Sequence, residues 1–223
     1  MASKVVIFEN CALTKRLRRI PNAWHFRFAL NLVFTAQWFR FGGLRCSPLN
    51  AALYAWRHPV IKTERLELRK FAQQDRSEVI KLLGNADFMA FSPTGAMTHD
   101  QADTRFEELV SAFQNKGIGK FCVVERTTGE LVGYCGIESF NYKGESVVEL
   151  GYRLKVSARG KGYAFEASSA VLSFASQMGY TKVLALTEPE NMPSQHILLK
   201  LGFKECGEGY YQNMPVQYFE KCI

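Results

Sequence analysis

Acidic residues are missing from most of the first quarter of the 223-residue sequence: between Asn10 and Thr63 there is neither aspartate nor glutamate. Residues 1–61 hold nine lysines and arginines against Glu9 alone, so their net charge is +8, whereas the net charge of the whole chain is +7. Residues 62–223, with 19 basic and 20 acidic side chains, therefore carry −1. The basic excess belongs to the N-terminal segment, so the rest of the chain argues against an obligatory acidic partner, and we expect no nucleic acid.

The N-terminal segment also lacks a long uninterrupted apolar run. Residues 26–41 are apolar, but Asn31, Thr35 and Gln37 interrupt them. The stretch is shorter than the roughly 20 residues that a membrane-spanning helix needs, and no clean cleavage site of a secretory signal follows it. We expect no membrane span, whereas an organelle transit peptide and a basic arm for anionic lipid or nucleic acid are both open.

Methionine is absent between Met1 and Met89, and the regular pattern of strands and helices begins almost at Val60. For a bacterial source, one hypothesis is that translation starts at a non-AUG codon at Val60 and that residues 1–59 are upstream sequence read in frame. A genuine extension is the alternative. We therefore divide the chain into a basic N-terminal extension, residues 1–59, and one domain, residues 60–223.

Cysteine pairs and histidine clusters at metal-ligand spacing are absent. The six cysteines are scattered, and several lie in apolar runs such as "FCVVE", where a cysteine is usually a small buried hydrophobe. These observations predict no metal and a reducing, cytoplasmic compartment. No function is assigned to the four histidines, His25, His58, His99 and His196.

From Val60 onward, the hydrophobic pattern predicts a regular order of strands and helices. Strand patterns occupy residues 61–71, 119–127, 131–140, 145–156, 181–189 and 212–222. Helix patterns occupy residues 73–85, 98–117, 164–179 and 191–202, with Thr98 as an expected N-cap and Gly117 as an expected end. This order predicts an α/β (α+β) fold with a mixed sheet.

The stretch "VSARGKGYAFEA", Val156 to Ala167, matches neither common glycine-rich phosphate loop. It fits neither G-x-x-x-x-G-K-[ST] nor G-x-G-x-x-G, because "GKG" at residues 160–162 is followed by "YAF". It does offer the end of a strand, small residues that let the backbone approach a ligand, and the N–H groups of a helix N-terminus. Arg159 and Lys161 add two positive charges, so the stretch predicts an anion site.

In this context, the pattern Arg159-x-x-Gly162-x-Ala164 resembles the pyrophosphate-binding signature of the GNAT superfamily of acyl-CoA-dependent N-acyltransferases. Three further motifs are similar to the family's and follow its order: "VIKTERLELR" as the opening strand, "ELGYRL" as the strand along the pantetheine arm, and "NMPSQHILLKLGF" as the Asn-x-x-Ser helix. The set is most similar to the ribosomal-protein N-acetyltransferase (RimJ/RimL-type) branch, over about residues 60–221. It implies a GNAT fold, with a mixed, mostly antiparallel twisted sheet and helices on both faces.

The resemblance implies acetyl-CoA as the co-substrate and assigns residues to it. The implied cofactor-binding residues are Leu154, Val156, Arg159, Gly160, Lys161, Gly162, Tyr163, Ala164 and Asn191. Arg159 and Lys161 would hold the pyrophosphate by charge-assisted hydrogen bonds, and Asn191 would hold the pantetheine amides.

Moving an acetyl group from a thioester to an amine requires a base for the amine, which must lose a proton before it attacks. Glu149, in "VVELGY", is the candidate base. Its apolar neighbours imply a strand in the core of the sheet, a setting that favours proton uptake by a carboxylate. The resemblance supports this residue, and Glu138 is the reserve.

The departing thiolate should receive a proton. Many members of the family carry a tyrosine seven residues after the asparagine of the last motif, but this sequence has Leu198 there, which cannot donate a proton. The resemblance therefore implies Ser194 as the catalytic acid, three residues after Asn191. Tyr210 and Tyr211 are alternatives.

The expected function is acetyl-CoA-dependent N-acetylation of a primary amine, on a protein N-terminus or a small molecule, by direct attack in a ternary complex. The alternative is a non-catalytic acyl-CoA-binding or sensor domain, to which Leu198 gives weight. We expect the loop over residues 88–98 and the helix after it to shape the acceptor pocket. A homodimer is compatible with either function.

Overall fold

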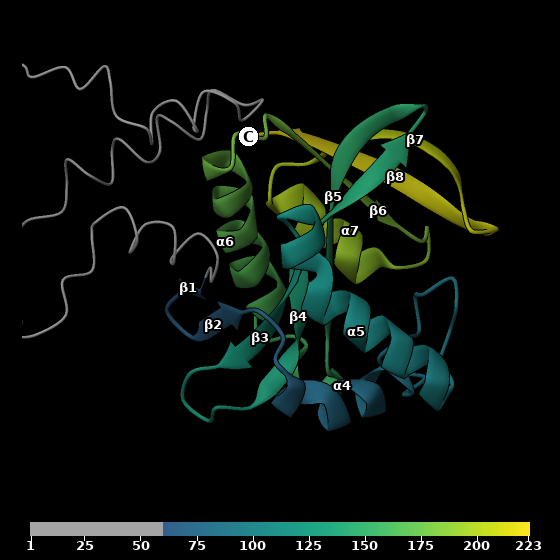
Figure 1. Cartoon of the computed structure of the whole chain (residues 1–223). Helices are drawn as coiled ribbons and strands as arrows, with labels where there is room; N and C mark the ends of the chain where they lie inside the picture. Colours follow the sequence, from purple (N-terminus) through teal and green to yellow (C-terminus); the bar gives the residue numbers. More distant parts are fainter. Residues whose placement is uncertain (1–59) are drawn as a thin grey trace, which may run out of the picture. The chain divides into compact units, whose positions relative to one another are not determined.

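The computed structural model describes residues 60–223, and the expectations for the extension, residues 1–59, lie outside this part of the chain. One sheet of eight strands has the order β1-β2-β3-β4-β5-β6-β8-β7 (Figure 1). The strands are β1 (Ile61–Lys62), β2 (Leu66–Arg69), β3 (Lys120–Glu125), β4 (Leu131–Tyr142), β5 (Glu145–Leu154), β6 (Lys182–Thr187), β7 (Lys204–Tyr211) and β8 (Met214–Cys222). The helices are η1 (Gln73–Asp75), α4 (Arg76–Leu83), α5 (His99–Lys116), η2 (Val156–Ala158), α6 (Tyr163–Gln177) and α7 (Met192–Lys200).

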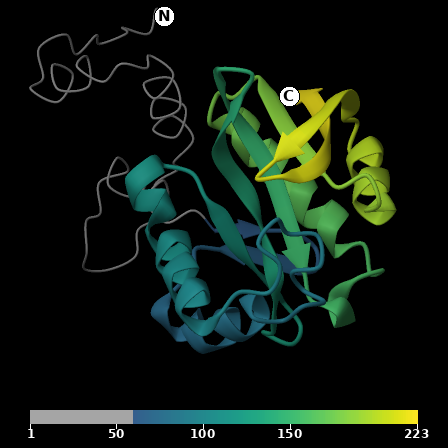
Figure 2. The ribbon, with the colours of Figure 1, turned by 90° about the vertical axis from the view of Figure 1, so that its right-hand side faces the viewer.

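Helices cover both faces of the sheet, as predicted. Successive side chains of strand β3 point to opposite faces of the sheet. Phe121 and Val123 pack in the apolar cluster that includes side chains of α6 and α7, whereas Cys122 packs with side chains of α4 and α5. Figure 2 shows α4 and α5 on one side of the sheet and α6 and α7 on the other. All neighbouring strands are antiparallel except β5 and β6, so the predicted mixed, mostly antiparallel sheet is confirmed.

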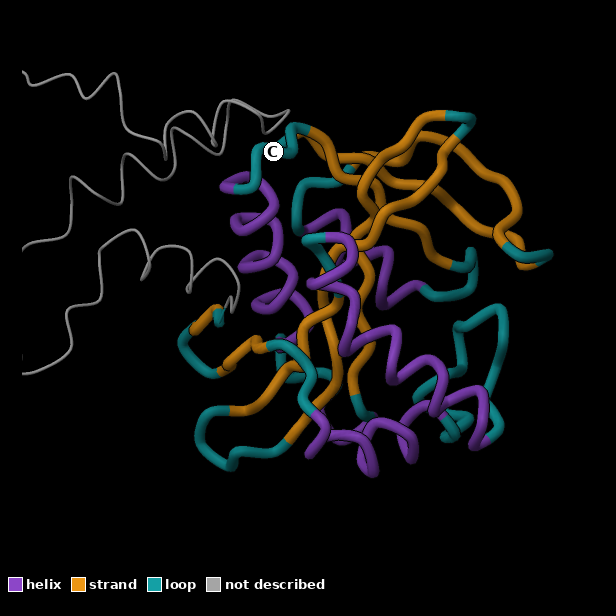
Figure 3. Tube along the Cα trace, in the orientation of Figure 1, coloured by secondary structure: helices purple, strands orange, loops and turns teal. Residues whose placement is uncertain are grey.

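The boundaries of α5 follow from its sequence. The Thr98 side chain accepts a hydrogen bond from the N–H of Gln101, and the Gln101 side chain accepts one from the N–H of Thr98. This capping box satisfies two N–H groups that the helix itself leaves free. The helix ends at Gly117, whose φ of 73° is left-handed and favours glycine. The loop before α5, at residues 84–98, is drawn in teal in Figure 3.

Residues 61–71, predicted as one strand, form a hairpin of β1 and β2 in which Ile61 lies opposite Leu68. The turn is closed by Thr63, whose N–H donates to the carbonyl oxygen of Leu66 at 2.9 Å and whose hydroxyl accepts from the N–H of Leu66 at 3.0 Å. Threonine makes such local turns, and the apolar alternation continues on both sides of it. Hydrophobic periodicity therefore did not reveal the hairpin.

Strand β7 was not predicted, although the final strand, β8, was. Two glycines interrupt the pattern of β7, and glycine weakens a strand. Gly207 has a φ of 143° at a bulge after Glu205, and a Cβ at Gly209 would lie 3.0 Å from the ring of Tyr218. Gly207 thus supplies the backbone conformation of the bulge, and Gly209 allows the close approach of Tyr218 on the neighbouring strand β8.

Strands β5 and β6 diverge. They pair at a single position, Glu149 opposite Leu184. Because β5 follows β4 along its whole length and β6 follows β8, each strand is drawn away from the other. We call the diverging ends, residues 150–154 and 185–187, the fork. The chain passes from one arm of the fork into η2 and α6 and from the other arm into α7.

Candidate active site

The predicted anion site lies at the N-terminus of α6. Gly160 and Gly162 have φ values of 75° and 80°, and Gly162 is the N-cap of the helix. A Cβ at Gly160 would meet no atom within 4 Å, so the surface beside this turn is open. The N–H groups of the first helical turn have no partner within a helix and carry a partial positive charge. These features are compatible with a phosphate group, and the binding of an anion at this loop stays a prediction.

Arg159 connects this loop to the chain that follows α4. Its Nε donates to the carbonyl oxygen of Leu154 at 3.1 Å, and its Nη2 donates to the carbonyl oxygen of Asp87 at 2.7 Å. The Lys161 ammonium lies 6.0 Å from the centre of the Tyr163 ring. The assignment of Arg159 and Lys161 to a pyrophosphate stays a prediction, and Arg159 also has a structural task.

The Tyr163 and Leu154 side chains are buried, at 6% exposure each, so these two predicted residues can offer a ligand only their backbone. The Tyr163 hydroxyl donates to Glu125, which raises the pKa of the tyrosine. Val156, in contrast, is 56% exposed beside the loop. Ala164 is the second residue of α6, where its small side chain leaves the helix N-terminus accessible.

Arg65 is a loop residue to which the sequence analysis gave no role. Its Nη1 donates to the carbonyl oxygen of Lys161 at 2.8 Å, and its Nε donates to Glu166 at 2.7 Å. Its guanidinium also lies 4.8 Å from the centre of the Tyr163 ring. Arg65 thus ties the hairpin of β1 and β2 to the start of α6. The motif "TERLELR" contains it, but no spacing in the sequence links residue 65 to residue 161.

Ser194 and Asn191 lie together at the start of α7. The Asn191 Oδ1 accepts a hydrogen bond from the N–H of Ser194 at 3.2 Å and caps the helix. The Ser194 hydroxyl lies 2.9 Å from the hydroxyl of Tyr152, on the other arm of the fork. Leu198, at the position of the missing tyrosine, is 1% exposed in the apolar core.

Tyr152 was missed by the sequence analysis. Burial raises the pKa of its hydroxyl to about 12, although the hydrogen bond to Ser194 lowers it. The hydroxyl therefore stays protonated at neutral pH and can donate. The alternation of β5 carried a usable signal, because it puts Tyr152 and Glu149 on opposite faces of the strand.

Glu149 lies on the face of α4 and α5, next to Glu138 on β4. Its surroundings are not apolar, which corrects the expectation from its neighbours in sequence. The ammonium of Lys120 lies 3.2 Å from the Glu149 Oε2 and 3.5 Å from the Glu138 Oε2. Lys120 is a buried residue that sequence reasoning did not single out.

Glu138 has a second cation beside it. The Arg105 Nη2 lies 3.0 Å and 3.3 Å from its two oxygens. Burial alone would raise the pKa of Glu138, but Lys120 and Arg105 together hold that pKa below its usual value. The pKa of Lys120 is raised, because the attraction of Glu149 and Glu138 outweighs the effect of burial.

A surface hollow of about 420 Å³ lies beside Arg105, between the loop and the first half of α5. Its lining includes Thr94, Met97, Asp100, Thr104, Arg105 and Glu108. This is the place that the sequence predicted for an acceptor pocket. Arg105 lines this hollow and also donates to Glu138, so one side chain links the hollow to the pair of carboxylates Glu138 and Glu149.

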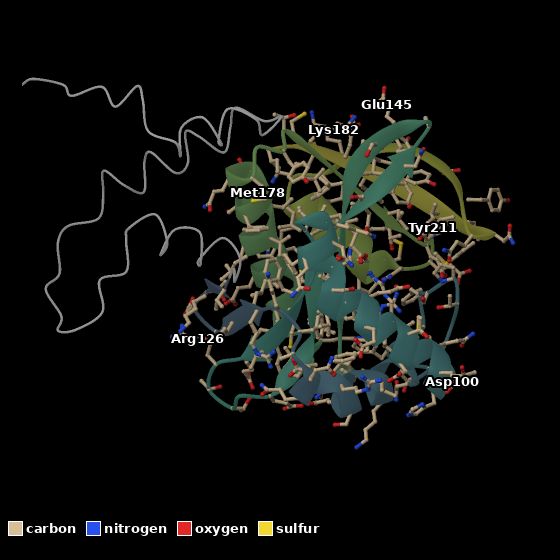
Figure 4. All side chains as sticks on the ribbon, viewed as in Figure 1. Asp100, Arg126, Glu145, Met178, Lys182 and Tyr211 are labelled. Atoms are coloured by element: carbon tan, nitrogen blue, oxygen red, sulfur yellow. The ribbon has the colours of Figure 1, made fainter. Side chains whose placement is uncertain are left out.

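Aromatic side chains continue the same face beyond the carboxylates. Phe140 lies 5.6 Å from Tyr211 and 6.4 Å from Tyr218, measured between ring centres. Figure 4 shows Tyr211 on the same side of the domain as Asp100 at the start of α5. Of the two tyrosines named as alternative acids, Tyr210 is 76% exposed, whereas burial raises the pKa of Tyr211.

Within residues 60–223, no group of three or more histidine, cysteine or acidic residues could hold a metal ion. Over the same residues, no helix is both long and apolar enough to cross a membrane.

Comparisons with known proteins agree with this geometry. The uncharacterized N-acetyltransferase YnaD of Bacillus subtilis is 32% identical over 168 residues, which cover 73% of this chain and 87% of YnaD. The crystal structure of a GNAT-family acetyltransferase from Bacillus anthracis has 28% identity and a TM-score of 0.62, over 73% of this chain and 98% of that one. RimL, a ribosomal L7/L12 α-N-protein acetyltransferase in complex with coenzyme A, shares the fold with 14% identity and a TM-score of 0.61, over 74% of this chain and 98% of RimL.

A family model described as "Acetyltransferase (GNAT) domain" matches residues 65–204. This match spans more than half of the chain. It includes the fork, the loop at the N-terminus of α6, and the side chains of Tyr152 and Ser194. The chain therefore belongs to the GNAT family of acetyltransferases and is an N-acetyltransferase.

Proposed function

We propose that the domain at residues 60–223 transfers an acetyl group from acetyl-CoA directly to a primary amine. The observation that carries this proposal is the order of groups along the β5 arm of the fork. Glu149 stands at its base, Tyr152 with Ser194 follows on the opposite face, and the loop at the N-terminus of α6 comes next. A thioester in the fork could be reached from both faces of the sheet, by the amine from one and by a proton donor from the other.

On the face of α4 and α5, Glu149 takes a proton from the incoming ammonium, directly or through one water. The amine nitrogen then attacks the carbonyl carbon of the thioester and gives its second proton to water as the carbon–sulfur bond breaks. On the other face, Ser194 gives its proton to the departing thiolate and regains one from solvent, directly or through Tyr152. The overall reaction yields the N-acetyl amine, the free thiol of coenzyme A and one proton, which Glu149 releases to water.

The remaining predicted residues hold the cofactor. The backbone N–H groups of Gly160, Gly162 and Ala164 and the Lys161 ammonium would bind the pyrophosphate, since helix N-termini and cations favour anions. The backbone of β5 at Leu154 and the exposed Val156 would flank the pantetheine arm. The Asn191 Oδ1 is occupied by the cap of α7, so its amide N–H₂ is the part that can contact the pantetheine.

The acceptor is proposed to be a protein N-terminus or a small amine, as in the RimJ/RimL-type branch. The similarity of the fold to RimL supports this class but does not choose within it. The hollow beside Arg105 and the aromatic side chains of Phe140 and Tyr211 are where the acceptor would lie. Leu198 stands where many members of the family have a tyrosine, and this loss of a proton donor gave weight to a non-catalytic sensor. The hydroxyls of Ser194 and Tyr152 offer a proton donor in its place.

The test is thiol release from acetyl-CoA in the presence of primary amines. A suitable panel holds peptides with N-terminal alanine or serine, spermidine and phenethylamine. We expect turnover with at least one class of amine and loss of that turnover in Glu149→Gln. Tight binding of acetyl-CoA without turnover on any amine would instead identify the sensor.

A further inference from the structure

A lysine is buried beneath the candidate base. The Lys120 side chain is 5% exposed, and lysine is almost never buried without a partner. Its ammonium lies 3.2 Å from the Glu149 Oε2, 3.5 Å from the Glu138 Oε2 and 3.3 Å from the carbonyl oxygen of Gly136. Three oxygens from two neighbouring strands therefore surround its three N–H groups.

The sheet leaves room for this lysine at Gly151. A Cβ at residue 151 would lie 2.5 Å from the Lys120 Nζ and 3.0 Å from the Glu149 Oε1. No other side chain than that of glycine could therefore occupy the position without displacing the ion pair. The backbone of Gly151 has no left-handed φ to explain the glycine, so the space is the physical reason for it.

The two carboxylates around Lys120 are not equivalent. Glu138 also receives two hydrogen bonds from Arg105, which in turn pairs with Glu108 on α5. Within residues 60–223, Lys120 is the cation in contact with Glu149, and it contacts only the Oε2. Tyr134, Tyr211 and the buried thiol of Cys135 are further titratable groups that interact with this cluster. Glu138 is thus held by two cations, whereas Glu149 keeps one oxygen without a protein partner.

We propose that Lys120 is a positioning residue, which fixes Glu149 through one carboxylate oxygen while the other oxygen accepts the proton of the acceptor amine. This inference rests on the proposed function. The contact of the buried ammonium group with Oε2 leaves Oε1 as the oxygen that can take the proton. A carboxylate held at one oxygen also loses less freedom when the substrate binds.

The first experiment is a direct titration that needs no acceptor. The protein is labelled with ¹³C at the glutamate side-chain carboxyl carbon, and the Glu149 signal is assigned by its absence in Glu149→Gln. In Lys120→Met, the carboxylate loses the ammonium group beside its Oε2, and we therefore expect it to take up its proton at a higher pH than in the wild type. An unchanged titration of Glu149 would overturn the inference.

Two further variants guard against loss of folding. Gly151→Ala removes no charge but pushes the Lys120 ammonium away, so Glu149 should titrate higher, in the same direction as in Lys120→Met. Lys155→Met is the matched control. Lys155 also bridges two glutamates, at 2.6 Å from Glu78 and 2.8 Å from Glu130, and it follows the far end of β5 from Glu149. The Lys155→Met variant should leave the titration of Glu149 unchanged.

Enzyme kinetics then separate this inference from the proposed function. With the best amine of the panel, the acidic limb of the pH profile of kcat/KM should move to higher pH in Lys120→Met, with activity recovering above it. A purely structural role would lower activity equally at every pH and would contradict the inference. If the wild type turns over no amine, the proposed function fails, and the titration still decides whether Lys120 controls Glu149.

Discussion

The two faces of the sheet at the fork differ in charge. The face of α4 and α5 carries Glu138, Glu149, Lys120 and Arg105 as one cluster of ion pairs. The face of α6 and α7 carries the hydroxyls of Tyr152 and Ser194 and no charged side chain in contact with them among the described residues. In the proposed reaction, a positive amine would lose a proton on the charged face, and a thiolate would gain a proton on the hydroxyl face. The difference in charge suits each face to one of these two proposed proton transfers.

The largest effect is expected on the charged face. Glu149→Gln keeps the size of the side chain but removes the base, so kcat at neutral pH should fall by about 10²- to 10⁴-fold. The measurement is thiol release from acetyl-CoA with the best amine of the panel. Glu145→Gln, on the exposed tip of the same strand, is the control and should stay close to the wild type (Figure 4). If kcat of Glu149→Gln falls by less than threefold, Glu149 is not the base and the charged face has no catalytic role.

A smaller loss is expected on the hydroxyl face. Ser194→Ala should lower kcat by about 10²-fold, and Tyr152→Phe by about tenfold, because Tyr152 acts through Ser194. The double variant should be no slower than Ser194→Ala, since coupled residues are not additive. Tyr180→Phe, at a half-buried tyrosine away from the fork, is the control. Additive losses would mean that the two hydroxyls act separately.

The loop before α6 should affect binding and not chemistry. Lys161→Ala should raise the KM for acetyl-CoA by about 3- to 10-fold and leave kcat within twofold, because in the proposed complex the charge would contact the cofactor far from the reacting atoms. The effect should shrink at high salt. Lys116→Ala, at an equally exposed lysine at the end of α5, should change neither constant. A fall in kcat with an unchanged KM would contradict the assignment of Lys161.

The smallest effect concerns stability in acid. The pKa of Glu138 is lowered in the folded state, so its stabilising contribution is present above the ordinary glutamate pKa of about 4.3 and is lost as the pH falls below it. Urea unfolding at pH 7 and pH 4 should therefore show a smaller loss of stability in Glu138→Gln than in the wild type. Glu145→Gln should show the same loss as the wild type. An equal loss in all three proteins would mean that the cluster does not stabilise the charged form of Glu138.

The sequence predicted the features that are encoded within a single short segment. Periodicity placed nearly every strand and helix, and the motifs placed residues 159–164 at the start of α6 and Ser194 near the start of α7. Strand β7 escaped because Gly207 and Gly209 break the strand pattern, and the hairpin at Thr63 escaped because apolar alternation continues through it.

The charged cluster of Lys120, Glu138 and Glu149 could not be predicted without knowing which residues of neighbouring strands lie opposite one another. Lys120 lies opposite Gly136 on β4, and Glu138 lies opposite Glu149 on β5, and no spacing within one segment reveals these pairs. Lys120 also reads as an ordinary surface lysine at the start of a strand. Tyr152 could have been found, since alternation along β5 places it on the face opposite Glu149.

The most direct test of the central claim is the pH dependence of kcat/KM for the wild type, Glu149→Gln and Ser194→Ala. Without its base, Glu149→Gln depends on amine that has already lost its proton in solution, so its activity should rise about tenfold per pH unit and approach the wild type at high pH. Ser194→Ala should stay below the wild type by a constant factor. If the profile of Glu149→Gln runs parallel to that of the wild type, Glu149 does not take the proton of the amine, and the division of labour between the two faces is wrong.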